Sequence, residues 1–328
     1  MTSGEFENRN AARWAEYERL VDAMERGQEI GGVERLPQRF RELCLDHSLV
    51  QARMYGIRLG ERLNALVIRG YKLIYRSRRH GWESVVRMAA VTFPATVRKE
   101  WRLFWLCSAV FWIPFLLLVW VAKHDLTWIQ SILGSQGMAQ MEEMYGGDSP
   151  LAKGRPGMGS DFMMFCFYIQ HNIGIDFSIF AGGILAGLGT LFYLFFNGLH
   201  IGAAAGYCNA VCNPQAFWSF VAGHSSFELT GMVISGMAGM RMGLAILWPG
   251  RLPRVRALVE ATKKAMPLIY GAAVMTACAA VLEGFWSAQP LTWLPGSAYA
   301  WKYSVGAVLW LLHIVYFLFA GRRAGDAA

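Results

Sequence analysis

Histidines, carboxylates and hydroxyls occur at a few positions within stretches that are otherwise apolar. Ionisable groups are costly to place at membrane depth, so each is a candidate for ion binding, proton transfer or a paired network. Threading the apolar stretches across a membrane places one set near the outer leaflet, with Lys302 as a candidate counter-charge. This outer polar cluster consists of His171, Asn172, Asp176, His224, Ser225, Glu228 and Glu283.

Three interpretations of the outer polar cluster compete. His224 and Glu228 are one helical turn apart, so they can present two metal ligands on one face, with Asp176 or His171 completing the site. The same stretch has the residue types of a serine hydrolase, but a nucleophile adjacent to its base seldom meets the geometric requirement. We favour a hydrogen-bonded network in which Ser225 caps a helix. No metal, cofactor or catalytic residue is predicted.

We assign a structural role to two smaller sets of residues. Asn197, His200 and Arg241 are predicted to lie at the inner end of the membrane region. Cys208 and Cys212 are one turn apart, but no second cysteine pair accompanies them, so packing is favoured over a zinc site.

The composition of the chain indicates which kind of structural element positions these residues. The chain is 55% hydrophobic and only 16% charged, whereas soluble domains carry about 25% charged residues. The excess apolar surface must therefore face lipid, and the stretch 103–122 has the length and lack of charge of a membrane span. We predict an all-α, polytopic bundle with further spans at 173–196, 198–222, 229–247, 265–286 and 301–320. The third of these six spans is broken at Asn213-Pro214.

Charge predicts the orientation. With six spans, the N-terminal third, the connection 251–264 and Arg322-Arg323 fall on one side, and all three are basic. The positive-inside rule makes that side cytoplasmic, with both termini inside and the connection 123–172 outside. An arginine-rich face beside anionic lipid explains the net charge of +8 without a nucleic-acid partner.

The chain is predicted to divide into a cytosolic part, 1–100, and a membrane part, 101–328. The cytosolic part contains amphipathic helices, for example one carrying Trp14, Tyr17 and Val21 at helical spacing, and an interfacial helix before the first span. In the membrane part, small residues recur every fourth position. They favour a tightly packed bundle, and one such stripe is a candidate homodimer interface. The stripe residues are Gly183, Gly187, Gly198, Gly202, Gly206, Gly231, Ser235 and Gly239.

Several of these residues together resemble a known family. The stretch 168–206, with His171-Asn172-Ile173 and Asn197-Gly198, and the element His224-x-x-x-Glu228-Leu229 resemble the stage II sporulation protein M (SpoIIM) membrane family. The family often has Asn-Asn at the first element and His-Gly at the last, where this chain has His224-Ser225. The resemblance implies a membrane scaffold for peptidoglycan-degrading partners in spore formers. Elsewhere it implies an association with MoxR-type ATPases and von Willebrand-type domains.

The leading functional hypothesis is a non-enzymatic scaffold or assembly factor in the bacterial inner membrane, at the cell envelope. Its expected partners are the lipid bilayer, a second copy of the chain, and a cytosolic MoxR-type ATPase or envelope proteins. The alternative is a transporter, channel or lipid-moving protein that uses the broken span and the outer polar cluster. A metal-dependent intramembrane hydrolase is the third hypothesis.

Overall fold

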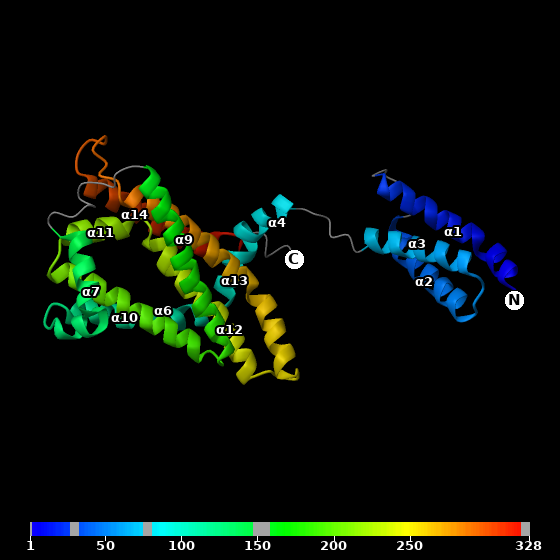
Figure 1. The fold of residues 1–328 in the computed structure, drawn as a ribbon, viewed down its shortest axis with the longest axis horizontal. Coiled ribbons are helices and arrows are strands. Elements are labelled where there is room, and N and C mark those ends of the chain that lie inside the picture. The colour runs from blue at the N-terminus through cyan, green and yellow to red at the C-terminus, as the bar shows by residue number, and fades with distance from the viewer. Residues whose placement is uncertain (1, 27–32, 75–80, 147–157, 323–328) are drawn as a thin grey trace. The chain divides into compact units, whose positions relative to one another are not determined.

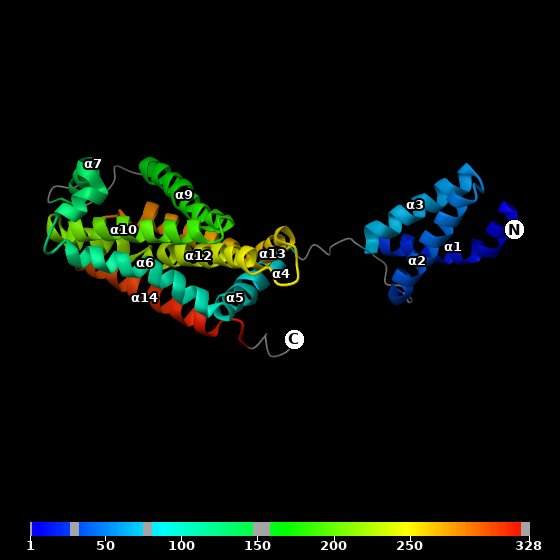
Figure 2. The same ribbon diagram turned by 90° about the horizontal axis from the view of Figure 1, so that it is seen from below.

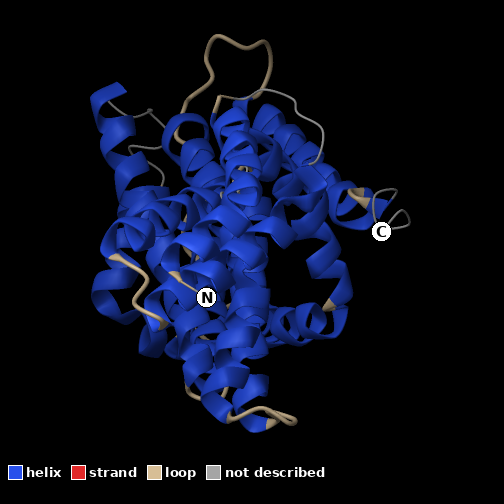
Figure 3. Cartoon of the chain, turned by 90° about the vertical axis from the view of Figure 1, so that its right-hand side faces the viewer, coloured by secondary structure: helices blue, strands red, loops and turns tan. Residues whose placement is uncertain are grey.

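The structure is a computed structural model that describes residues 2–26, 33–74, 81–146 and 158–322. Within these ranges the regular structure is helical and contains no strand (Figure 3), which confirms the predicted all-α class. The chain forms two compact units, Met1–Gly81 and Trp82–Ala328. Residues 82–100, which the sequence analysis grouped with the N-terminal region, therefore cluster with the membrane unit.

Among its described residues, the N-terminal unit contains three α-helices: α1 (Ser3–Glu25), α2 (Leu36–Ala52, after the 3-10 turn Val33–Arg35) and α3 (Ile57–Ile74) (Figure 1). A capping box starts α1, because the Thr2 side chain accepts from the backbone of Glu5 while the Glu5 side chain accepts from that of Thr2. The predicted apolar stripe of α1 is buried. Its core partners come from α2 and α3 and include Leu43, Leu63 and Leu66.

The membrane unit begins with short helical elements and continues as long helices (Figures 1 and 2). Its elements are α4 (Gly81–Arg87), η2 (Met88–Thr92), α5 (Phe93–Lys99), α6 (Trp101–Val121), α7 (Thr127–Tyr145), α9 (Met158–Ala181), η3 (Gly182–Ile184), α10 (Leu188–Ala210), α11 (Pro214–Ala222), α12 (Ser225–Leu247), α13 (Arg254–Leu282), η4 (Glu283–Ser287) and α14 (Ala298–Phe319).

Five helices of the described residues are long and apolar enough to cross a membrane: Trp101–Val121, Leu188–Ala210, Ser225–Leu247, Arg254–Ser287 and Ala298–Phe319. Four of them correspond to the first, fourth, fifth and sixth predicted spans. The helix α9, 24 residues long, is not among them. The predicted count of six therefore exceeds the five spans that length and apolarity support.

The predicted second and third spans were wrong in their limits. The expected span 173–196 crosses a reversal of the chain, because Ala186 (φ 52°) and Gly187 (φ 86°) adopt left-handed backbone conformations between α9 and α10. The first part of α9, from Met158, was expected in the outer connection 123–172. The break at Asn213-Pro214 is confirmed: α10 ends at Ala210, and the Asn213 side chain caps α11.

The helix α12 is the centre of the membrane unit, with 72% of its most apolar window buried. It packs most extensively against α13 and also contacts α6, α9 and α10. Its small residues admit the backbones of these neighbours: a Cβ added at Gly239 would lie 2.9 Å from the carbonyl oxygen of Ile179. Gly183 and Gly187, expected within a helix, lie instead at the α9–α10 reversal and face Gly239 and Gly243.

A second small-residue stripe joins α10 to α6. Gly198, Gly202 and Gly206 face the α6 backbone, and a Cβ at Gly202 would lie 2.6 Å from the Cα of Phe115. Helices of the same chain therefore occupy the faces that carry both stripes, which confines them to packing within one molecule.

Candidate functional site

Two interruptions of helical geometry assemble the outer polar cluster. The turn between α11 and α12 places His224 at the N-cap of α12, and Glu228 follows in the first turn of that helix. At the end of α13 the chain continues as a π-helical turn, η4, whose first residue is Glu283. One nitrogen or oxygen atom each from His224, Glu228 and Glu283 lie within 4.8 Å of one another. Among the described residues, this is the only group of three such side chains with metal-ligand spacing.

Burial and hydrogen bonds hold this group in place. His224 and Glu283 are buried and Glu228 is half-buried. The Nε2 atom of His224 lies 3.8 Å from a carboxylate oxygen of Glu228, and its Nδ1 atom lies 3.2 Å from the hydroxyl of Ser287. The histidine ring is therefore fixed on one side by η4 and directed on the other toward Glu228.

Two side chains of α14, those of Lys302 and Trp310, form hydrogen bonds to residues beside this group, one of them Ser225. The ammonium group of Lys302 on α14 donates a hydrogen bond to the carbonyl oxygen of Ser287 at 2.8 Å. Trp310 on the same helix donates to the Ser225 hydroxyl at 3.2 Å. Lys302 therefore lies beside the cluster, and its ammonium group bonds to a backbone carbonyl oxygen rather than to a carboxylate.

Asp176 lies deeper in the bundle, between α9, α12 and α13. It is 2% exposed and accepts a hydrogen bond from the hydroxyl of Thr276. A Cβ at Gly231 would lie 3.8 Å from one carboxylate oxygen of Asp176, so this glycine makes room for the pair. The other oxygen, Oδ1, has no hydrogen-bond partner among the described residues. Burial of a carboxylate with one unbonded oxygen costs folding free energy. Asp176 is therefore a candidate either for binding a proton or for ordering the helices packed around it.

The remaining predicted site residues lie elsewhere. His171 is exposed and stacks on Phe167 with a centroid separation of 5.5 Å, and Asn172 is buried beside it in α9. Arg241 forms an ion pair with Glu100, and Asn197 donates to the carbonyl oxygen of Tyr193. The charge partner Glu100 was missed, because residues so far apart in sequence carry no signal of their contact.

The position predicted for His200 was wrong. Because α10 runs from Leu188 to Ala210, His200 lies halfway along it rather than at its inner end. There it lines a cavity of about 740 Å³ together with His224, Ser225 and Glu228, a size typical of small-molecule sites. The aromatic wall of this cavity, which no sequence pattern indicated, comes from four different helices. It is formed by Trp112, Phe115, Tyr145, Phe217, Trp218, Tyr303 and Trp310.

Apolar helices long enough to cross a bilayer, packed through glycines around α12, define a multi-pass helical membrane protein with a polar group buried among its helix ends. The profile of the family described as stage II sporulation protein M (SpoIIM) matches residues 107–288. The match covers more than half of the chain, which therefore belongs to this family, and the predicted resemblance is confirmed.

The two units of the chain match different families. Residues 4–76 match a domain of unknown function, DUF8413, within the N-terminal unit. No curated protein and no solved structure matches the chain.

Proposed function

We propose that this protein is a membrane-anchored docking protein, a non-enzymatic scaffold or assembly factor whose N-terminal unit binds a cytosolic partner. The observation that carries the proposal is a groove at one end of the N-terminal unit, where α2 and α3 are joined. It encloses about 530 Å³ and is lined by residues of both helices.

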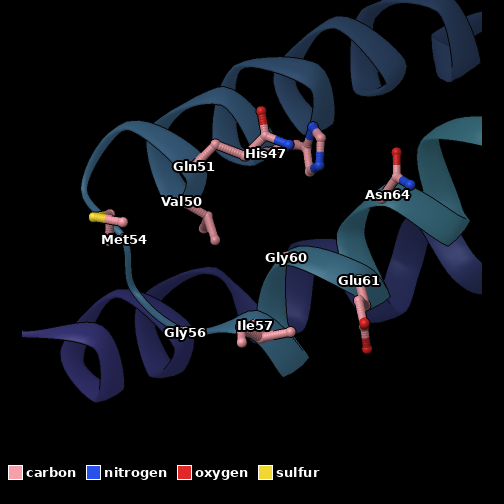
Figure 4. A pocket seen from close by; sticks show the side chains of 9 residues that line it. All are labelled: His47, Val50, Gln51, Met54, Gly56, Ile57, Gly60, Glu61 and Asn64. Atoms are coloured by element: carbon pink, nitrogen blue, oxygen red, sulfur yellow. The ribbon is translucent and has the colours of Figure 1, made fainter.

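Figure 4 shows the composition of the groove. Met54 occupies the turn between the helices and Ile57 begins α3, with His47 and Gln51 on α2 and Glu61 on α3 supplying polar groups. Met54 is 90% and Ile57 82% exposed to solvent. Exposed apolar side chains with a polar rim are typical of protein interaction surfaces, and methionine adapts readily to differently shaped partners. The groove therefore suits an apolar anchor side chain of a partner protein.

The membrane unit supplies the anchor in this proposal, with the lipid bilayer as its permanent partner. The proposal includes α9 as a sixth crossing helix, because an even number of spans places the basic segments 251–264 and Arg322-Arg323, and both termini, on the cytoplasmic side of a bacterial inner membrane. The partners that the family resemblance implies are a MoxR-type ATPase or envelope proteins. A second copy of the chain would need a face other than the glycine stripes, such as the α14 surface bearing Leu311 and Val315, which are exposed.

Site-specific photo-crosslinking in intact cells tests the docking proposal. A photoreactive amino acid at Met54 is expected to capture a defined partner, whereas the same probe at Ala15, exposed on α1, is expected not to. The variants Met54→Glu and Ile57→Glu should abolish capture of that partner by a probe at Gln51, because a charge replaces an apolar contact. Equal capture from Met54 and Ala15, or none from either, would contradict the proposal.

A second candidate function, that of a transporter, channel or lipid-moving protein, rests on the cavity of about 740 Å³ beside Glu228. Purified protein in liposomes would then accelerate lipid scrambling or solute flux, and Glu228→Gln would reduce the rate. Glu143→Gln, on an exposed position of α7, provides the matched control. Rates equal to those of protein-free liposomes would exclude this function for the lipids and solutes assayed.

A further inference from the structure

The residues His224, Glu228 and Glu283 combine three features of a metal-binding site. The first is convergence: they come from two elements separated by more than fifty positions in the chain, and their ligand atoms lie within 4.8 Å of one another. Two neighbouring ligand atoms of a tetrahedral zinc ion are about 3.4 Å apart, given metal–ligand distances near 2.1 Å. The 3.8 Å between His224 Nε2 and Glu228 therefore needs only a small side-chain rotation to accommodate an ion.

The second feature is the orientation of the histidine. A metal-binding histidine usually donates its other ring N–H to a nearby oxygen, which fixes the tautomer and directs the free lone pair to the metal. His224 has this arrangement, because its Nδ1 atom faces the Ser287 hydroxyl at 3.2 Å while Nε2 faces Glu228. The carbonyl of Ser287 is in turn held by Lys302. The supporting contacts thus leave Nε2 available to a ligand.

The third feature is the set of ligand atoms. Glu283 is buried and Glu228 is half-buried, and their carboxylate oxygens lie within 4.8 Å of each other and of the His224 ring nitrogen. One imidazole nitrogen and two carboxylate oxygens form a ligand set that binds divalent transition metals in proteins. A divalent cation would bind both carboxylates and the imidazole at the same time.

We propose that His224, Glu228 and Glu283 bind one divalent transition-metal ion through an imidazole nitrogen and two carboxylate oxygens. His224 and Glu228 also line the cavity of about 740 Å³, so the ion faces that cavity, where water completes its coordination. The bound ion links the start of α12 to the end of α13 and stabilises the outer end of the membrane unit. This inference is independent of the docking proposal, which concerns the N-terminal unit alone.

Zinc titration of the full chain tests the site. Protein purified in detergent and stripped with EDTA is titrated with Zn²⁺ against a fluorescent chelator, and X-ray absorption defines the ligands. We expect about one zinc per chain and nitrogen and oxygen ligands only. Binding of less than about a tenth of an equivalent would overturn the proposal. Sulfur ligands would also overturn it, because they would assign the zinc to Cys208 and Cys212.

Matched variants locate the site. His224→Ala and Glu283→Gln should each weaken zinc binding by at least about tenfold, and Ser287→Ala should weaken it less, because it removes only the support of the imidazole. The controls His171→Ala and Glu143→Gln change exposed side chains of the same types and should leave zinc affinity unchanged. Unchanged affinity in monodisperse Glu283→Gln protein, or equal losses in the controls, would contradict the assignment. Should His224→Ala or Glu283→Gln fail to fold, the wild-type stoichiometry and ligand type still decide.

Discussion

The two units of this chain are both helical, but their helices are held together by opposite kinds of residue. The N-terminal unit packs large side chains inside, such as Trp14, Tyr17 and Leu63, and places arginine–carboxylate pairs on its surface. The membrane unit reverses the arrangement: glycines such as Gly202 and Gly239 lie between helices, while large side chains such as Trp105 are exposed.

The solvent explains the difference. In water, burial of apolar side chains drives association by roughly 25 cal/mol per Å², so large residues belong inside. In lipid an apolar side chain gains little by moving from acyl chains to protein, so close backbone contact and hydrogen bonds must hold the helices. The same residue type therefore stabilises one unit and not the other. Substitutions that exchange large and small side chains should therefore affect the two units differently.

Removal of the largest core side chain should damage only the N-terminal unit. Trp14 is 1% exposed and donates to Asp46 at 2.8 Å, so Trp14→Ala should cost about 3–5 kcal/mol of that unit's stability. Hydrogen exchange of the full chain in detergent should show lost protection in α1, α2 and α3. The helices of the membrane unit are the internal reference, and lost protection there would contradict the independence of the two cores.

The opposite substitution should damage the membrane unit. Gly202→Leu places a branched side chain against the Phe115 backbone, where a Cβ alone would already lie 2.6 Å from Cα. Overpacking of this kind typically costs about 1–3 kcal/mol, so heating in detergent should give an earlier unfolding transition. Gly174→Leu is the matched control, because nothing lies within 4 Å of a Cβ at that position of α9. Equal losses from both variants would show that helix propensity, not close packing, explains the glycines.

A smaller effect is expected from one buried hydrogen bond. Thr190 on α10 is fully buried and donates to the carbonyl oxygen of Ile179 on α9 at 2.8 Å, across the reversal between these helices. Thr190→Val keeps the shape but removes the donor, so it should cost about 1 kcal/mol. Thr262→Val, which removes a bond within α13, should cost less in the same thermal assay.

The smallest effect concerns the surface of the N-terminal unit. Arg69 pairs with Asp22 and Glu25, and its hydrogen bond to Glu25 lowers the pKa of that carboxyl below its usual range. A carboxyl with a lowered pKa contributes stability above its unfolded-state pKa, and that contribution is lost as the pH falls through the folded-state value. The difference between wild type and Arg69→Met in hydrogen exchange of α1 should therefore shrink on acidification and in high salt. A difference that persists under both conditions would point to lost packing of the arginine stem.

Much of the fold could be predicted from local patterns. Charge-free apolar length identified the first span, and Asn213-Pro214 marked a helix break because proline cannot continue a helix. The prediction of a membrane span at 173–196 was wrong because glycines can reverse the direction of a chain without adding a polar residue to an apolar run. The reversal depends on close contact of Gly187 with Gly243 of α12, and that contact has no local signature.

For the outer polar cluster, the sequence by itself determined the residue types and the pairing of His224 with Glu228, because residues one turn apart on a helix share a face. Only the tertiary structure decided that Glu283 joins them, that Asp176 lies deeper beside Thr276, and that His171 lies apart. The physical reason is that distances between helices follow from packing contacts many residues apart, chiefly where glycines let α12 approach its neighbours.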